Sequence, residues 1–121
     1  MSKQSALIEL RDKLRQFAKE RDWEQFHNPK NLVMALSGEM GELCELFQWL
    51  TPEESIELPK SAKGERLEEE LADLFLYLIR LADVLDIDLI KASEAKMEKN
   101  ARNYPIEQAY GNRTKYTEFK K

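Results

Sequence analysis

Residues 36–49 read LSGEMGELCELFQW, and this stretch decides the fold because it sets three glutamates among the apolar residues of one helix. On a helix that turns by about 100° per residue, Glu39 falls within the apolar face, Glu42 at its edge and Glu45 further out. A carboxylate removed from water without compensation costs on the order of several kcal/mol. The rest of the chain must therefore bring a cation, a proton or a water-filled cleft to Glu39.

The composition favours one helical domain. The chain has 121 residues, enough for one core but too few for two independent ones, so we expect a single domain over residues 1–121. Hydrophobic residues make up 42% and charged residues 35%, and the scarcity of Gly, Pro and short alternating runs argues against strands. We therefore expect an all-α fold, a four-helix bundle.

Charge, cysteine count and hydropathy exclude several classes of partner and of site. A net charge of −4 gives no basic surface for DNA or RNA. The single cysteine, Cys44, excludes an intrachain disulfide and a cysteine-based zinc site. No apolar run approaches the roughly 20 residues that span a bilayer, and the N-terminus does not resemble a signal or transit peptide. We expect no membrane association and a cytoplasmic location.

Apolar spacing and terminal signals predict four long helices. They are expected at about 5–21, 28–50, 65–85 and 88–103. The segments 22–28 and 59–64 are expected to be connectors, and 105–121 an irregular arm without a helical period.

The third helix is apolar around more than half its circumference, which is typical of a central helix in a bundle. A polar strip interrupts this surface at steps of three and four residues. The strip contains Arg66, Glu70, Asp73, Tyr77 and Arg80. A monomer would leave part of the apolar surface exposed, so we expect a homo-oligomer, a dimer or tetramer.

Two acidic motifs, Glu39-x-x-Glu42 and Glu70-x-x-Asp73, offer ligands for a metal ion. Residues three apart on a helix have Cβ atoms roughly 5–6 Å apart, and antiparallel helices about 8–10 Å apart let four carboxylates converge. Oxygen ligands without His or Cys select Mg²⁺ or Mn²⁺ over zinc. A di-iron bundle would need Glu-x-x-His pairs, whereas the only histidine, His27, lies in an expected connector.

Four stretches, in one order along the chain, carry a resemblance to a known family. They are LSGEMGELCELFQWL (36–50), EELADLFLYLIRLAD (69–83), KMEKNARNYP (96–105) and KYTE (115–118). They resemble the MazG-like all-α nucleoside triphosphate pyrophosphohydrolases, most closely their dCTP pyrophosphatase branch. The resemblance implies Mg²⁺-dependent hydrolysis of a (deoxy)nucleoside triphosphate such as dCTP to the monophosphate and pyrophosphate, which would control or sanitise the nucleotide pool. It also suggests a dimer of dimers.

The resemblance also implies residue roles. The metal ligands would be Glu39, Glu42, Glu70 and Asp73. A carboxylate not fully engaged by metal, Glu42 or Glu45, would orient the attacking water as catalytic base. The substrate-binding residues would be Lys96, Asn100 and Arg102 near phosphate or sugar, and His27, Trp49 and Tyr77 around the base. Trp23 or Phe26 would close the base pocket.

Two alternatives stay open at this point. The same chemistry serves related enzymes with another substrate, such as dUTP or phosphoribosyl-ATP, and the acidic motifs do not separate them. A non-catalytic helical interaction module would turn the acidic strip toward water or a basic partner.

Overall fold

The computed structural model describes residues 3–120, and every regular element in that range is a helix. The long helices are α1 (Lys3–Glu20), α2 (Pro29–Phe47), α4 (Gly64–Val84) and α5 (Leu89–Asn103). The short ones are α3 (Pro52–Glu57), α6 (Ile106–Ala109) and the 3-10 helices η1 (Glu24–Phe26), η2 (Leu58–Lys60) and η3 (Tyr116–Glu118). The all-α prediction is confirmed, and each of the four predicted segments overlaps one long helix. Over the described residues, no helix is both long and apolar enough to cross a membrane.

The chain divides into two compact units, Met1–Ile87 and Asp88–Lys121. The acidic motifs and most of the helical content belong to the first unit, whereas α5, α6 and η3 form the second. The expectation of a single domain stays a prediction.

Side-chain caps explain where the helices begin. The Asn28 side chain accepts a hydrogen bond from the amide of Asn31 (2.9 Å) at the start of α2, with Pro29 at the first helical position. Asp88 accepts from the amide of Lys91 (3.0 Å) at the start of α5. Both caps lie at the first residue of a segment that the sequence predicts to be helical, 28–50 and 88–103.

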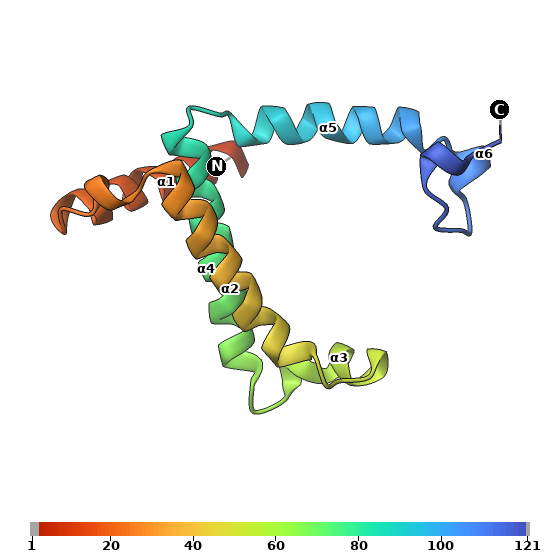
Figure 1. Ribbon diagram of the computed structural model, residues 1–121, viewed down its shortest axis with the longest axis horizontal. Helices are drawn as coiled ribbons and strands as arrows, with labels where there is room; N and C mark the ends of the chain where they lie inside the picture. Colours follow the sequence, from red (N-terminus) through yellow and green to blue (C-terminus); the bar gives the residue numbers. More distant parts are fainter. Residues whose placement is uncertain (1–2, 121) are drawn as a thin grey trace. The chain divides into compact units, whose positions relative to one another are not determined.

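In the first unit, α2 and α4 run antiparallel along one another, and α1 packs against α4 (Figure 1). Apolar side chains close both ends of the α2–α4 pair. At the end nearest α1 the buried residues are Ala18, Leu32, Ile79 and Ala82. At the other end, under α3 and η2, they are Leu46, Leu58 and Leu67, packed with Leu43, Phe47 and Leu50. The acidic motifs lie between these two apolar clusters on both helices.

Three regions outside the long helices are more ordered than the sequence predicts. The segments expected as connectors contain η1 and η2, and the expected irregular arm contains α6 and η3. In the arm, the ring of Tyr104 makes edge contacts with Tyr116 and Phe119, each at 5.7 Å between centroids. A four-residue helix is too short to show a helical period, which is why the pattern did not predict α6.

One face of α4 stays exposed in the described chain. Its large apolar side chains are between 39% and 51% exposed, and they are Leu71, Phe75, Leu78 and Leu85. Their spacing of three, four and seven residues places them on one stripe of the helix.

Gly64, at the start of α4, provides a test of the packing of the 58–64 connector. A Cβ atom at Gly64 would meet the carbonyl oxygen of Pro59 at 2.2 Å, whereas a Cβ at Gly38 would meet nothing within 4 Å. We expect Gly64→Ala to lower the free energy of unfolding by about 1–3 kcal/mol. The control Gly38→Ala should raise it by about 0.5–1 kcal/mol, since alanine favours the helix. Urea unfolding measures both, and a Gly64→Ala protein as stable as the parent would contradict the close approach.

Candidate active site

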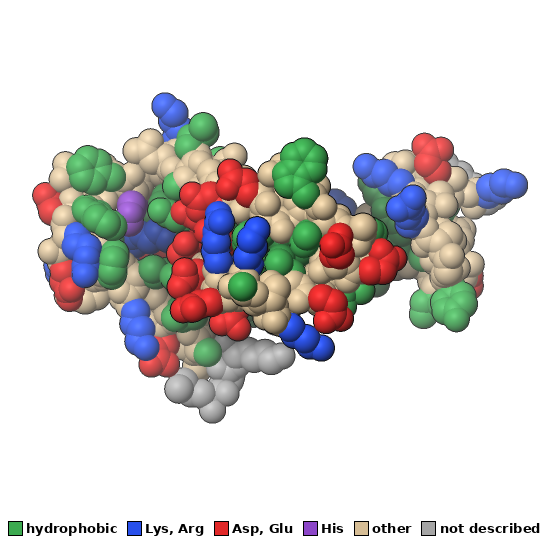
Figure 2. Space-filling view, turned by 90° about the horizontal axis from the view of Figure 1, so that it is seen from below, with side chains coloured by type: hydrophobic (Ala, Val, Ile, Leu, Met, Phe, Trp, Pro, Cys, Tyr) green, Lys and Arg blue, Asp and Glu red, His purple; other side chains and the backbone are tan. Residues whose placement is uncertain are grey.

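Three carboxylates from two helices converge between the apolar clusters. Glu39 on α2 and Glu70 and Asp73 on α4 each place a carboxylate oxygen within 4.8 Å of the others. Glu70 is only 8% exposed, Glu39 is half-buried and Asp73 is exposed. On the face that is seen from below in Figure 1, acidic side chains are interspersed with lysine and arginine side chains (Figure 2). We call Glu39, Glu70 and Asp73 the acidic cluster.

The acidic cluster contains unsatisfied acceptors. Within the described residues, Oε2 of Glu39 and Oε2 of Glu70 are buried and have no hydrogen-bond partner. Buried polar atoms in folded proteins are nearly always paired, and an unpaired acceptor costs about 1–3 kcal/mol. A divalent cation would supply the missing partner, and an all-oxygen ligand set suits Mg²⁺ or Mn²⁺. The residues present therefore fit a metal ion of this kind.

Burial and mutual repulsion change the acidity of the cluster. Burial, followed by the interaction with the carboxyl group of Glu70 and the charges of Glu42 and Asp73, raises the pKa of Glu39 to about 7. Burial is also the main cause that raises the pKa of Glu70, and the nearby guanidinium of Arg66 opposes it. Carboxylates crowded together out of water favour the protonated form. Near neutral pH Glu39 is therefore partly protonated, and a bound cation would displace this proton.

The two other glutamates of α2 differ in their surroundings. Glu42 is exposed at the edge of the acidic cluster, close enough for its charge to raise the pKa of Glu39 and Glu70. A carboxylate oxygen of Glu45 lies 3.7 Å from the guanidinium of Arg66, which also lies 3.8 Å from Glu70. Arg66 belongs to the polar strip that the sequence predicts, but no partner was predicted for it. Its position four residues before Glu70 was the available signal.

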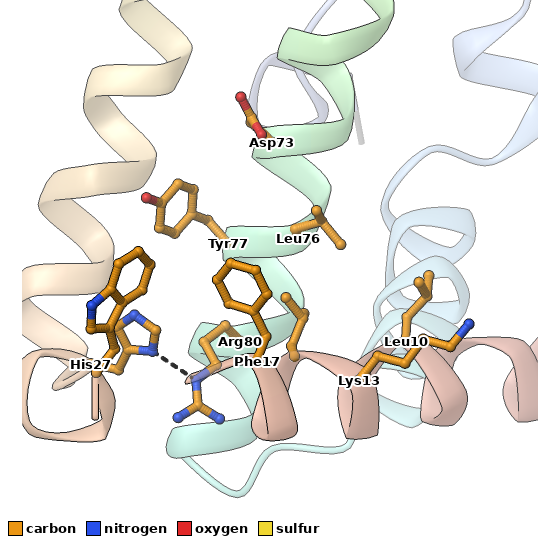
Figure 3. A pocket seen from close by; sticks show the side chains of 10 residues that line it. Leu10, Lys13, Phe17, His27, Asp73, Leu76, Tyr77 and Arg80 are labelled. Carbon is orange, nitrogen blue, oxygen red and sulfur yellow. Dashed lines mark hydrogen bonds between the residues drawn. The ribbon is translucent and has the colours of Figure 1, made fainter. Parts of the chain in front are cut away.

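A pocket of about 440 Å³ adjoins the acidic cluster in the first unit. Its walls come from α1, the 23–27 segment and α4, as Figure 3 shows. The lining residues include Phe17, Trp23, His27, Asp73, Tyr77 and Arg80. Asp73 belongs to both the pocket and the acidic cluster, so a molecule in the pocket can reach the carboxylates.

Some residues predicted around a base lie in this pocket and others do not. His27, Tyr77 and Trp23 line it, whereas Phe26 is exposed outside it. Trp49 is 86% exposed and lies beyond the C-terminal end of α2, because that helix ends at Phe47. His27 and Trp49 thus flank opposite ends of α2, and one chain does not bring them to the same pocket. The substrate-binding role of each stays a prediction.

The three predicted phosphate or sugar contacts belong to α5 in the second unit. Lys96 and Arg102 are exposed and Asn100 is half-buried. The substrate-binding role of these three residues stays a prediction.

Comparisons with known proteins identify relatives of this chain. The model of a family described as the MazG-like family matches residues 34–119. Two relatives named dCTP pyrophosphatase 1, from Homo sapiens and Bos taurus, are 46% and 45% identical over 119 residues, which is 98% of this chain and 70% of each relative. A crystal structure of a pyrophosphatase from Archaeoglobus fulgidus has a TM-score of 0.77 and 46% identity, and the match covers 83% of this chain and 93% of that chain.

The raised pKa of Glu39 predicts a pH-dependent stability in the absence of metal. Folding favours the protonated form, so the contribution of Glu39 to stability is fully present below its ordinary pKa of 4.5 and is lost as pH rises through about 7. In chelator at about pH 8, Glu39→Gln should raise the free energy of unfolding by about 1–2 kcal/mol, a gain reduced by the partial exposure of the group.

Urea unfolding at about pH 8 and pH 5 measures the effect, and the gain from Glu39→Gln should shrink at the lower pH. Glu98→Gln, an exposed position on α5, is the control and should show no such dependence. Addition of Mg²⁺ at the higher pH should reverse the order and leave the parent more stable than Glu39→Gln. If Glu39→Gln raised the free energy of unfolding equally at both pH values, the burial of the Glu39 carboxylate would be contradicted.

Proposed function

Because this chain belongs to the MazG-like family, we propose that it is a nucleoside triphosphate pyrophosphohydrolase, which yields the nucleoside monophosphate and pyrophosphate. We propose dCTP-like deoxynucleotides as its substrates, since relatives 45% and 46% identical carry the name dCTP pyrophosphatase 1. The observation that carries the proposal is the position of Asp73, which joins the acidic cluster to an aromatic-lined pocket. The enzyme would control or sanitise the nucleotide pool, and its cytoplasmic location stays a prediction.

Glu39, Glu70 and Asp73 would hold the metal ion, with Glu42 at the edge as a fourth ligand. The buried unpaired oxygens of Glu39 and Glu70 support this assignment. We propose Mg²⁺, with Mn²⁺ as a substitute, because the ligand set is all oxygen. When bound, the cation would neutralise charge on the triphosphate and polarise the α-phosphorus.

Hydrolysis between the α and β phosphates needs a base for the attacking water. The water oxygen forms a bond to the α-phosphorus, the bond from that phosphorus to the bridging oxygen breaks, and pyrophosphate leaves. Glu45 is engaged by Arg66, so we assign the role of proton acceptor to Glu42 rather than Glu45. Glu42 is exposed at the edge of the cluster, where water has access.

The pocket would hold the base, with the triphosphate directed toward Asp73. Tyr77 follows Asp73 by about one turn of α4, roughly 6 Å along the helix. The aromatic rings of Trp23 and Tyr77 and the imidazole of His27 line the pocket and can stack on a base. Lys96, Asn100 and Arg102 of α5 are proposed to contact phosphate or sugar.

The exposed stripe of α4 supports a homo-oligomer, a dimer or tetramer, in which a second copy covers Leu71, Phe75 and Leu78. The exposure of Trp49 fits the same proposal. Because Trp49 lies at the opposite end of α2 from His27, a role for it in base binding would have to serve the pocket of another copy.

Of the two alternative functions, one is disfavoured and the other stays open. The names of the relatives disfavour a non-catalytic interaction module. Hydrolysis of dUTP or phosphoribosyl-ATP uses the same carboxylates and is separated from dCTP hydrolysis only by assay.

Turnover of a panel of deoxynucleoside and ribonucleoside triphosphates with Mg²⁺ tests the activity. We expect pyrophosphate and the monophosphate as primary products, with dCTP among the best substrates. Glu39→Gln and Asp73→Asn should each lower kcat by at least about 100-fold, because they weaken charge stabilisation at the phosphorus. Glu98→Gln is the matched control. Orthophosphate as the primary product, or no turnover of any triphosphate, would refute the proposal.

Light scattering tests the homo-oligomer. The parent should have at least twice the mass of one chain at micromolar concentration, and Phe75→Glu should lower the mass by placing a charge in a buried interface. Ser93→Glu, which adds the same charge at an exposed position of α5, should not. A parent protein that is monomeric at working concentration would rule out the proposed assembly.

A further inference from the structure

Arg80 makes a buried contact with the single histidine of the chain. Its Nε–H donates a hydrogen bond to Nδ1 of His27 over 3.1 Å. Arg80 is only 8% exposed and both residues line the pocket. Figure 3 shows the bond as a dashed line, with Tyr77 and Asp73 further along α4. The contact joins α4 to the 23–27 segment, more than 50 residues earlier in the chain.

The chemistry of this bond fixes where the imidazole proton lies. A guanidinium has donors and no acceptor, and it is not deprotonated in proteins. Nδ1 of His27 must therefore offer its lone pair to Arg80. The proton of the neutral ring is then on Nε2. Within the described residues the bond from Arg80 is the hydrogen bond that the side chain of His27 makes, so Nε2–H is available to a ligand.

We propose that Arg80 is a positioning residue that holds His27 as the neutral Nε2–H tautomer, so that the pocket presents a fixed hydrogen-bond donor to an acceptor atom of its ligand. The ligand class rests on the proposed function, in which the acceptor is a base carbonyl oxygen or an unprotonated ring nitrogen. Cytosine offers both at O2 and N3, whereas uracil and thymine carry a proton on N3. The tautomer itself does not depend on which nucleotide is hydrolysed.

An ion pair with Asp83 also holds Arg80 in place. Its guanidinium lies 3.5 Å from Oδ2 of Asp83, and Arg15 of α1 donates two hydrogen bonds to the same carboxylate. The hydrogen bond from Arg15 is the main reason that the pKa of Asp83 is lowered, so this group stays anionic. Asp83 would keep Arg15 as its partner if Arg80 were replaced. The site is therefore expected to tolerate removal of Arg80 without leaving a buried charge unpaired.

The other contacts of His27 are consistent with a neutral ring held in one orientation. Its ring packs edge-on against Trp23, with 6.3 Å between centroids, and Trp23 packs in the same way on Phe17. Burial is the main cause that lowers the pKa of His27, and the charge of Arg80 lowers it further. The other charged groups that line the pocket are Lys13 from α1 and Asp73 from α4.

Nitrogen-15 NMR of the imidazole reads the tautomer directly, and the single histidine makes the assignment unambiguous. At about pH 8 in the parent, Nδ1 should show the shift of an unprotonated nitrogen and Nε2 that of a protonated one. In Arg80→Met both shifts should move toward an average of the two tautomers, and the pKa of His27 should rise toward its ordinary value. Arg80→Lys, which keeps a donor without an acceptor, should restore part of the parent pattern. Arg113→Met, the same change at an exposed position of the second unit, is the control.

Kinetics give the second readout. Loss of a fixed donor to the base should raise KM for dCTP by roughly fivefold to tenfold with a smaller change in kcat, since the bond forms equally in the ground and transition states. A protonated Nδ1 in the parent, or unchanged shifts and pKa in Arg80→Met, would overturn the proposal even if dCTP is hydrolysed. Failure of the parent to hydrolyse any triphosphate would refute the proposed function while the NMR result still decides the tautomer.

Discussion

The cost of holding Glu39 and Glu70 together away from water is the constraint on which the first unit depends. Their buried oxygens lack partners, and the pKa of both groups is raised, so the carboxylates repel one another unless a proton or cation lies between them. The apolar clusters at the two ends of the α2–α4 pair oppose this repulsion. Helix packing thus maintains an arrangement of charge that the carboxylates alone would not adopt, and a bound cation would relieve it.

Asp73 connects the acidic cluster to the pocket in which a base would be recognised. The α4 helix carries the carboxylates Glu70 and Asp73, then Tyr77 and Arg80, each about one turn after the last. One helix therefore sets the distance between the proposed metal site and the proposed base pocket. α1 contributes through Arg15, which holds Asp83 and so supports the contact between Arg80 and His27.

Much of the fold and part of the candidate site could be predicted because the relevant physics is local. The caps at Asn28 and Asp88 involve neighbouring residues, and the position of Glu39 on an apolar face follows from helix geometry. The prediction that Glu70 and Asp73 converge with Glu39 required only the assumption that two apolar helices pack together. The expected helix over residues 28–50 included Trp49. In the structure α2 ends at Phe47, so Trp49 does not continue its helical period.

By itself the sequence determined the helices, their capped starts and the presence of an acidic motif on each of two core helices, because spacing of three and four residues acts within one helix. The tertiary structure alone decided which side chains meet between elements. Arg66 pairs with Glu45, and Arg80 donates to His27, across separations that no helical period encodes. Such contacts depend on the rotation and offset of one packed helix against another, which are fixed by the core as a whole rather than by any local pattern.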